Sequence, residues 1–383
     1  MHNLKFPIGP QHPGVKEPIY LKVFAEGDTV TKVEFRGGYV HRGMEKLMEG
    51  QETITAMHSA EKICGICSYA HNSCLTSAIE GILKINPSLS VKMTRNVIGE
   101  LERIHSHLMW LGFLFHDAGF DTLFMYYWRE REKVLELFEK ITGQRVHHAI
   151  NFIGTTKINI SESDKLWINK SLRGIKGKVN DYYKDLINNS VIKERFRGVG
   201  FISKDYASLY NTVGPTARAS GIQWDTRLTG YSGFNELSFE AITSMDCDVY
   251  ARTIVRIKEI AESINIIEQA LEKITKPAPA WKETWIKRGE GYARVEAPRG
   301  ELFYYISVKK NHLLRVKVKT PTFNNFPVLL KILEGEKLSN IPLIVASIDP
   351  CIGCMERLLL VKDGRSNILS KHEFMRRYCG HEH

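Results

Sequence analysis

Apolar residues recur at helical spacing over two long stretches in the middle of the chain. Side chains three and four positions apart share one face of a helix, so each stretch predicts a helix with one buried face. The first stripe consists of Leu101, Ile104, Leu108, Leu111 and Phe115. The second consists of Ile257, Ile260, Ile264, Ile267, Leu271 and Ile274. We interpret both stripes as the core of a helical bundle.

Short strand patterns occur on either side of these helices. Residues 19–24 and 30–35 are β-type runs joined by a turn at Gly27, and residues 302–308 and 313–318 form a second such pair. We therefore expect an α+β fold that is mainly α. It would be a large helical bundle with small antiparallel β elements from the N-terminal and C-terminal segments.

The same patterns divide the chain into four segments. Residues 1–45 are an N-terminal β-rich segment, and residues 46–290 are the helical bundle. Residues 291–357 form a C-terminal segment of strands and loops, and residues 358–383 are an extension beyond it. Because both ends of the chain contribute β elements to one bundle, we expect the two ends to meet.

The composition is that of an ordinary globular protein. Hydrophobic residues make up 43% and charged residues 25% of the 383 residues. The longest apolar run, residues 108–115, is far shorter than the roughly 20 residues that span a bilayer. The N-terminus lacks the apolar core of a signal peptide. We therefore expect a cytoplasmic chain, in which the 7 cysteines are free or metal-bound rather than paired in disulfides.

The net charge of +10 raises the question of a nucleic-acid partner. The basic residues are spread along the chain and accompany no recognised nucleic-acid-binding motif, so we expect no nucleic acid. Docking to an acidic protein or to an anionic membrane surface accounts for the charge equally well.

Two Cys-x-x-Cys pairs carry the strongest chemical signal. The first pair is Cys64 and Cys67, the second is Cys351 and Cys354, and residues 68–350 lie between them. Thiolates are soft ligands, so two pairs brought together by the fold make a four-sulfur site for a soft transition metal. Structural zinc sites usually take their pairs from one compact segment, so this wide separation favours the centre of an enzyme. A structural zinc held by the same cysteines remains the alternative.

The residues around both pairs resemble a known family. Residues 61–71 and 347–357 resemble the two nickel-binding motifs of the [NiFe]-hydrogenase large subunit, and residues 296–300 (Glu-Ala-Pro-Arg-Gly) resemble a further motif of that family. Residues 9–13 and 214–221 are similar to the membrane-bound, energy-converting (group 4) enzymes and to the quinone-site subunit of respiratory complex I. That complex I subunit lacks the four metal cysteines, whereas this chain has all of them, so we expect a hydrogenase.

The resemblance implies a Ni–Fe centre whose iron carries carbonyl and cyanide ligands. It implies that Cys67 and Cys354 bridge the two metals, while Cys64 and Cys351 bind nickel alone. His71, four residues after Cys67, is implied to hydrogen-bond a bridging sulfur. A [4Fe-4S] cluster is expected in a partner small subunit and not in this chain, which has no further set of cysteines for one.

Four more side chains are assigned from the same resemblance. Glu45, in a segment that resembles the family's Arg-Gly-x-Glu motif, is the candidate first proton acceptor. Because Lys46 follows directly, an exposed charge run is the alternative. Arg299 is implied to lie over the open coordination position and to polarise hydrogen, with Asp349 as its anionic neighbour. Asp117 is a further candidate carboxylate over the site.

The implied activity is the reversible conversion of H2 into two protons and two electrons by the catalytic subunit of a membrane-bound hydrogenase. Electrons would pass to the small subunit and on to ferredoxin, and integral membrane subunits of a complex I-like assembly would couple the reaction to ion translocation. The chain would then be a peripheral subunit at the cytoplasmic face of the cell membrane. In the family a maturation protease cuts three residues past the last cysteine, which implies cleavage after Arg357 here. Residues 358–383 would then be a removable extension, and a family member that keeps this tail is the alternative.

Two other hypotheses stay open. The first is a hydrogenase-related subunit that does not turn over hydrogen, such as a sulfur reductase or a quinone- or ion-pump-coupling subunit. The second is a non-catalytic scaffold with a structural zinc. Metal content separates the scaffold from the other hypotheses, and hydrogen turnover separates the hydrogenase from its relative.

Overall fold

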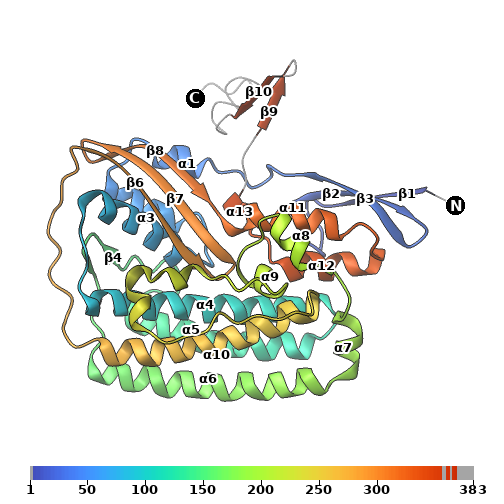
Figure 1. Ribbon diagram of the computed structural model, residues 1–383, viewed down its shortest axis with the longest axis horizontal. Coiled ribbons are helices and arrows are strands. Elements are labelled where there is room, and N and C mark those ends of the chain that lie inside the picture. The colour runs from blue at the N-terminus through green and yellow to red at the C-terminus, as the bar shows by residue number, and fades with distance from the viewer. Residues whose placement is uncertain (1–2, 356–358, 363–364, 369–383) are drawn as a thin grey trace.

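A layer of long helices forms the base of the molecule in the computed structural model, which describes residues 3–355, 359–362 and 365–368 (Figure 1). The layer consists of α4 (Leu89–Asp117), α5 (Asp121–Thr142), α6 (Glu162–Asn188) and α10 (Val249–Lys273). The residues of both apolar stripes are buried along α4 and α10. They pack into one hydrophobic core with the inward faces of α5 and α6, so the expected bundle is confirmed.

A three-stranded antiparallel sheet lies over one end of this layer (Figure 1). Its strands are β6 (Arg288–Ala297), β7 (Gly300–Lys309) and β8 (His312–Lys319). Alternate residues of β7 are buried, as expected for a strand with one face on the core. The sheet packs against α1 (Met44–Met48), α2 (Thr53–Glu61) and α3 (Ser68–Leu83). Cys64, Cys67 and Cys351 belong to the hydrophobic core of this second unit.

The two ends of the chain form the third part of the molecule. The N-terminal strands β1 (Asn3–Ile8), β2 (Tyr20–Glu26) and β3 (Thr29–Arg36) make an antiparallel sheet. Beside it lie α11 (Pro321–Ile332), α12 (Ile341–Ile348) and α13 (Ile352–Met355) (Figure 1). Buried residues of β2, β3 and these helices share a third hydrophobic core. The ends of the chain therefore meet, as the two cysteine pairs require.

Short elements connect these three parts. They are β4 (Asn151–Phe152), β5 (Thr155–Thr156), α7 (Ser190–Phe196), α8 (Lys204–Leu209), α9 (Gly214–Arg218), η1 (Thr226–Thr229), η2 (Tyr231–Glu236) and η3 (Leu338–Asn340). β9 (Leu359–Lys362) and β10 (Arg365–Ile368) pair as an antiparallel ladder within the expected extension. Arg357, the expected cleavage position, lies outside the described residues.

The expected fold class, α+β and mainly α, is confirmed. The two expected strand pairs correspond to β2–β3 and β7–β8, whereas β1 and β6 are additional strands that the sequence does not predict. Glycines interrupt the alternation in β6 because α3 approaches it closely: a Cβ atom at Gly291 would lie 2.5 Å from the carbonyl oxygen of Ala78. The division into four segments stays a prediction.

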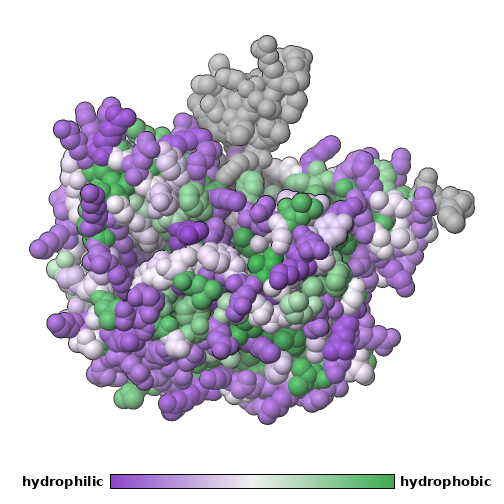
Figure 2. Space-filling model, in the orientation of Figure 1, coloured by the Kyte–Doolittle hydropathy of each residue, from purple (hydrophilic) through white to green (hydrophobic). Residues whose placement is uncertain are grey.

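Apolar surface is scattered over the molecule. The face seen in Figure 2 shows hydrophilic residues around most of the outline, with hydrophobic residues between them. Large exposed hydrophobic side chains occur on distant elements, such as Leu166 on α6 and Tyr292 on β6. Within the described part of the chain, no helix is both long enough and apolar enough to cross a membrane.

Candidate metal centre

The four cysteines of the two pairs lie together where two loops meet. Cys64 lies between α2 and α3, Cys67 precedes α3, Cys351 lies between α12 and α13, and Cys354 lies on α13. The Sγ atoms of Cys64 and Cys351 are 3.7 Å apart, and those of Cys351 and Cys354 are 2.6 Å apart. A ring nitrogen of His71 and the sulfurs of Cys67 and Cys354 lie within 4.8 Å of one another. The structure therefore brings all four expected ligands and His71 together.

The four thiols are close enough to shift one another's pKa values. Hydrogen bonds from the other three cysteines hold the pKa of Cys64 well below its usual range. For Cys67 and Cys351 the hydrogen bond from Cys354 lowers the pKa, but the contact with Cys64 and burial outweigh it, and both pKa values are raised. A bound metal displaces thiol protons, so this buried set of four sulfur donors suits a soft transition metal such as nickel or zinc.

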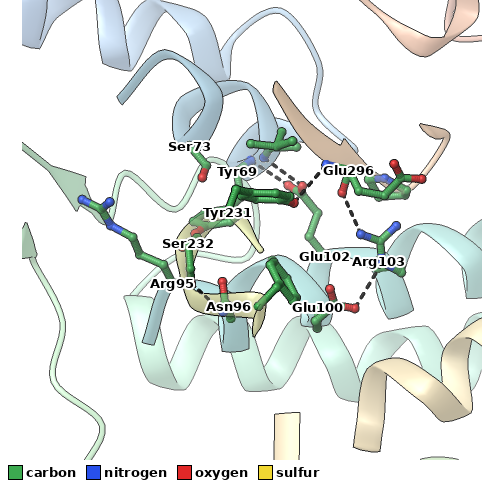
Figure 3. A pocket seen from close by; sticks show the side chains of 15 residues that line it. Tyr69, Ser73, Arg95, Asn96, Glu100, Glu102, Arg103, Tyr231, Ser232 and Glu296 are labelled. Carbon is green, nitrogen blue, oxygen red and sulfur yellow. Dashed lines mark hydrogen bonds and ion pairs between the residues drawn. The ribbon is translucent and has the colours of Figure 1, made fainter. Parts of the chain in front are cut away.

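Glu102 on α4 fixes the start of α3 and, with it, the first cysteine loop. Its carboxylate accepts hydrogen bonds from the backbone N–H groups of Tyr69 at 2.6 Å and Ala70 at 3.0 Å (Figure 3). These N–H groups have no partner within the helix, and the helix dipole favours a carboxylate at this end. Burial nevertheless raises the pKa of Glu102. The sequence does not single out this residue, because it is one polar position among several on a long helix.

His71 lies one turn into α3, as the spacing after Cys67 predicts. Its Nδ1 is 2.7 Å from the hydroxyl oxygen of Tyr304 on β7. Burial lowers the pKa of His71 to about 4 and raises the pKa of Tyr304, so both groups are neutral at pH 7. When the phenol donates to Nδ1, the imidazole proton lies on Nε2 and is available to a sulfur acceptor.

Glu17, between β1 and β2, holds the second cysteine loop. Its Oε2 accepts hydrogen bonds from the backbone N–H groups of Ile352 and Gly353, the latter at 3.1 Å. Burial raises the pKa of Glu17, against these hydrogen bonds and the charge of Arg299. The sequence analysis misses this carboxylate. Its position shortly after residues 9–13, a segment that carries part of the family resemblance, is the signal that would have found it.

Arg42 links the two cysteine loops directly. Its guanidinium donates to the carbonyl oxygens of Lys62 at 2.8 Å and Ile63 at 2.5 Å, just before the first pair. It also lies 3.3 Å from the carbonyl oxygen of Gly353, inside the second pair. One side chain thus sets the separation of two loops that are far apart in the sequence.

Glu45 lies on α1 and turns its carboxylate to β8. Oε1 accepts a hydrogen bond from the backbone N–H of Val318 at 2.8 Å, and Oε2 is 3.4 Å from Nζ of Lys317. Lys46 pairs with Glu49 at 2.9 Å one turn on. The role of Glu45 as first proton acceptor stays a prediction. Glu17 is a second candidate, because its carboxylate contacts a cysteine loop.

Arg299 and Asp349 form a buried ion pair beside the cysteines. Nη2 of Arg299 donates to Oδ1 of Asp349 at 2.7 Å, and Nε donates to its backbone carbonyl at 3.0 Å. Burial lowers the pKa of Arg299, but the charges of Asp349 and the cysteines outweigh burial and raise it. Residues 214–221 pack on the turn that carries this arginine: a Cβ atom at Gly214 would lie 2.3 Å from the carbonyl oxygen of Arg299.

A cavity of about 440 Å³ lies beside this ion pair. Its lining includes polar groups and apolar side chains, among them Glu17, Arg299, Asp349, Cys351, Met109, Trp110 and Phe113. Asp117 also lines it, with Oδ1 2.6 Å from Nζ of Lys16 and Oδ2 buried without a hydrogen-bond partner in the described chain. Burial raises the pKa of Asp117. The cavity is a space for small molecules between a fixed cation and an apolar wall.

A buried layer of charge pairs supports the turn that carries Arg299. The layer consists of Arg103, Arg218, Arg227, Glu100, Asp225, Glu259 and Glu296. Arg218 lies 2.8 Å from Glu259 on α10 and 2.8 Å from Glu296 on β6. Figure 3 shows Arg103 between Glu100 and Glu296. Since a buried charge is tolerated only with its partners, the layer fixes α4, α10 and β6 relative to one another.

Known proteins resemble this chain over nearly its full length. The family model of the 49 Kd subunit of respiratory-chain NADH dehydrogenase matches residues 117–287 and 280–357, and that of nickel-dependent hydrogenase matches residues 42–121. The membrane-bound hydrogenase subunit alpha of Pyrococcus furiosus is 34% identical over 97% of this chain and 92% of its own length. A component of the F(420)H(2) dehydrogenase of Methanosarcina mazei is 32% identical over 91% of this chain and 96% of its own length.

The fold is shared with a solved respiratory complex. A chain of the membrane-bound sulfane sulfur reductase, an archaeal respiratory membrane complex, superposes with a TM-score of 0.86. It is 26% identical, and the match covers 92% of this chain and 97% of that one. The chain therefore belongs to the oxidoreductase family that joins the large subunits of nickel-dependent hydrogenases with the 49 Kd subunits of respiratory-chain NADH dehydrogenases.

Proposed function

We propose that the chain is the catalytic large subunit of a membrane-bound [NiFe]-hydrogenase that interconverts H2 with two protons and two electrons. One observation carries the proposal: the sulfurs of Cys64, Cys67, Cys351 and Cys354 lie together, with the first three residues buried and Cys354 partly exposed. Respiratory relatives with other substrates share the fold, so the four-sulfur donor set, and not the fold, favours hydrogen as the substrate.

The four cysteines would hold nickel and iron, with Cys67 and Cys354 shared between the metals. When bound, this centre, with carbonyl and cyanide ligands on iron, would supply the heterolytic cleavage of dihydrogen. The protein supplies the surroundings. Arg299, held by Asp349, places a permanent positive charge at the cavity wall beside Cys351, where it can polarise a bound molecule.

Protons must leave this buried place through titratable side chains. Glu17 is our candidate for the first acceptor, because its carboxylate contacts the loop of the second cysteine pair and burial raises its pKa toward a working range. Only its Oε2 is engaged by the backbone, so Oε1 is available for a proton. Glu45, whose carboxylate contacts β8, remains a candidate for a later step of the proton route. Asp117 is a further candidate carboxylate in the wall of the cavity.

Partners are proposed from the relatives. The hydrogenase and respiratory relatives are subunits of membrane complexes by name, which supports a peripheral position for this chain on such a complex. We propose a [4Fe-4S] small subunit as the electron acceptor, ferredoxin as the distal carrier, and ion-translocating membrane subunits at the cytoplasmic face. A maturation protease acting after Arg357 completes the proposed set.

A second function is supported by the size of the cavity. At about 440 Å³ it falls in the range of pockets that bind organic ligands and exceeds what dihydrogen needs. A complex I-like subunit that acts on a larger substrate, as in sulfur or quinone reduction, would use such a space. Under this alternative the metal site is inactive toward hydrogen.

Infrared spectroscopy of the complex, purified without oxygen from its native host, tests the proposal. We expect sharp bands in the carbonyl and cyanide stretching region, one nickel per copy of this chain with iron in excess because of the partner's [4Fe-4S] cluster, and hydrogen uptake with a ferredoxin or an artificial electron acceptor. Protein that has lost residues 358–383 but shows no such bands would support the alternative function. Zinc in place of nickel, without carbonyl or cyanide bands, would support the scaffold.

A further inference from the structure

Asp349 lies between the buried guanidinium groups of Arg299 and Arg256. The sequence motif at residues 296–300 contains Arg299, whereas Arg256 belongs to no motif. Oδ1 of Asp349 accepts a hydrogen bond from Arg299 at 2.7 Å, and its Oδ2 lies 3.4 Å from Nη1 of Arg256 on α10. Arg299 is 5% exposed and Arg256 is 1% exposed, so water does not replace either partner. The two arginines share one carboxylate.

Arg256 is held at this point by packing against α4. Its guanidinium lies over the ring of Trp110, 4.2 Å from the centroid. Trp110 in turn donates from Nε1 to the carbonyl oxygen of Ala346 on α12 at 2.7 Å. Burial lowers the pKa of Arg256 to about 10, against the attraction of Asp349, so the side chain is still a cation at neutral pH. α4 and α10 thus fix a positive charge at the end of α12.

The orientation of Arg299 depends on Asp349, which also contacts Arg256. The hydrogen bonds of Arg299 go to the carboxylate and the backbone carbonyl of Asp349, whereas its Nη1 is buried with no hydrogen-bond partner among the described residues. Asp349 ends α12 in the left-handed conformation, with φ 59° and ψ 54°. A residue other than glycine keeps such a conformation only where its surroundings hold it. Any shift of Asp349 therefore moves Arg299.

We infer that Arg256 is a positioning residue for Arg299: it holds the second oxygen of Asp349 and thereby fixes the Arg299 guanidinium at the wall of the cavity beside the cysteines. The inference rests on the proposed function for the role of Arg299. When Arg256 is removed, Asp349 keeps Arg299 as its counter-ion, so no carboxylate is buried without a cation. The expected loss is one of orientation rather than of fold.

The first test compares Arg256→Gln with Arg252→Gln in the purified complex. Arg252 is a matched control because it is buried one turn earlier on α10 and donates to Ser347 Oγ at 3.1 Å and to the carbonyl oxygen of Gly200 at 2.8 Å. We expect Arg256→Gln to lower kcat for hydrogen about 10- to 100-fold with little change in KM. We expect Arg252→Gln to leave kcat near the wild-type value, and Arg256→Lys to recover most of the turnover.

A double-mutant cycle separates positioning from general damage. Arg299→Lys alone is expected to lower kcat about 100- to 1,000-fold. Adding Arg256→Gln should lower it no further, because Arg256 acts through Arg299. Effects that multiply, or an equal loss in Arg252→Gln, would overturn the inference. If Arg256→Gln does not assemble, Arg256→Met and Arg252→Met, which keep an unbranched side chain but carry no positive charge, make the same comparison.

Cryo-electron microscopy of the same complexes gives a readout that needs no turnover. We expect the Arg299–Asp349 pair to stay intact but to shift at the cavity wall in Arg256→Gln, and to keep its wild-type position in Arg252→Gln. An unmoved Arg299 in Arg256→Gln would overturn the inference. A metal-loaded wild-type complex that turns over no hydrogen would instead refute the proposed function, and the position of Arg299 in the maps would still decide the inference.

Discussion

The two cysteine loops supply the same kind of ligand but are built in different ways. The first loop runs directly into a long helix: Cys67 precedes α3, and Glu102 caps the first turn of that helix. The second loop lies between two short helices and is held by polar side chains from distant segments, namely Glu17, Arg42 and Arg299. Both loops place cysteines in one hydrophobic core, but charged side chains from distant segments hold the second loop, and residues 349–352 form part of the cavity wall.

Because the two loops are held differently, we expect substitutions around the first loop to affect mainly stability and substitutions around the second loop to affect mainly turnover. Groups that hold the first loop are buried within secondary structure, so their loss should disturb folding and assembly. Groups that hold the second loop carry charge next to the open space, so their loss should change turnover while the core stays intact. A site that must admit a small molecule and release protons needs one side that can be reached, and a rigid side that fixes the geometry.

We expect the largest effect on hydrogen turnover from substitution of Cys354 on α13. Cys354→Ser replaces a soft ligand with a hard hydroxyl, so we expect hydrogen uptake and evolution to be abolished, with loss of bound nickel. The chain should still fold, because the bundle core contains none of the four site cysteines. Hydrogen turnover and metal content of the purified complex check this.

A matched control for that substitution is Cys74→Ser. Cys74 is fully buried on α3, and its thiol donates to the carbonyl oxygens of Ala293 at 3.3 Å and Leu302 at 3.6 Å, where a serine hydroxyl can also donate. We expect this variant to keep metal and turnover. Activity that persists in Cys354→Ser, or equal losses in both variants, would contradict the assigned role of Cys354.

The next effect distinguishes two carboxylates. Glu17→Gln keeps an oxygen that accepts hydrogen bonds from the second loop but cannot take a proton, so we expect turnover to fall about 100- to 1,000-fold with metal retained. Glu45→Gln, at the edge of β8, should cost less. The two variants are compared by hydrogen-dependent dye reduction and by metal analysis. If Glu45→Gln shows the larger loss, Glu45 is the first acceptor and Glu17 only supports the loop.

The sequence predicts some parts of the site and misses others. The apolar stripes of α4 and α10, the meeting of the cysteine pairs and the neighbourhood of Arg299 and Asp349 follow from periodicity or from motifs, and the structure contains them. Glu17 and Arg256 are single polar residues that neither a motif nor the apolar pattern of their own segment singles out. Their roles arise from packing between elements far apart in the chain, which local spacing does not encode.

The Arg-Gly-x-Glu segment shows the same limit within one motif. Resemblance draws attention to its glutamate, yet it is Arg42 whose guanidinium reaches the carbonyl oxygens of both cysteine loops. A motif identifies a segment that matters, and the fold decides which of its side chains points to the site. Backbone carbonyl partners leave no trace in the sequence at all.

The stability of the first loop should depend on pH through Glu61, three residues before Cys64. Burial raises the pKa of Glu61 to about 7 from 4.5, against a hydrogen bond from the backbone of Ala149. Because the folded state then binds the proton more tightly than the unfolded chain, stability is greatest below pH 4.5 for this group and is lost as the pH rises to about 7. The expected loss is roughly 3 kcal/mol.

Glu61→Gln should remove this dependence. Thermal midpoints of the purified complex between pH 5 and 8 would fall less steeply with pH in Glu61→Gln than in the wild type. The exposed Glu283→Gln, which removes the same charge from the surface, serves as the control and should follow the wild type. Parallel curves for all three proteins would mean that Glu61 does not titrate in this range.

The smallest effect is expected at the contact that ties the first loop to the sheet. Tyr304→Phe removes the hydroxyl that forms the hydrogen bond with Nδ1 of His71, so the imidazole loses the partner that fixes its tautomer. Turnover should fall about 10-fold, in the range seen when groups that orient ligands are removed. With the proposed centre bound, a shift of the cyanide and carbonyl bands in the infrared spectrum would accompany it, because the imidazole of His71 would no longer keep a fixed orientation toward the sulfurs of Cys67 and Cys354. Unchanged bands together with an unchanged rate would show that burial alone holds His71, and the contrast between the two loops would then rest on Glu102.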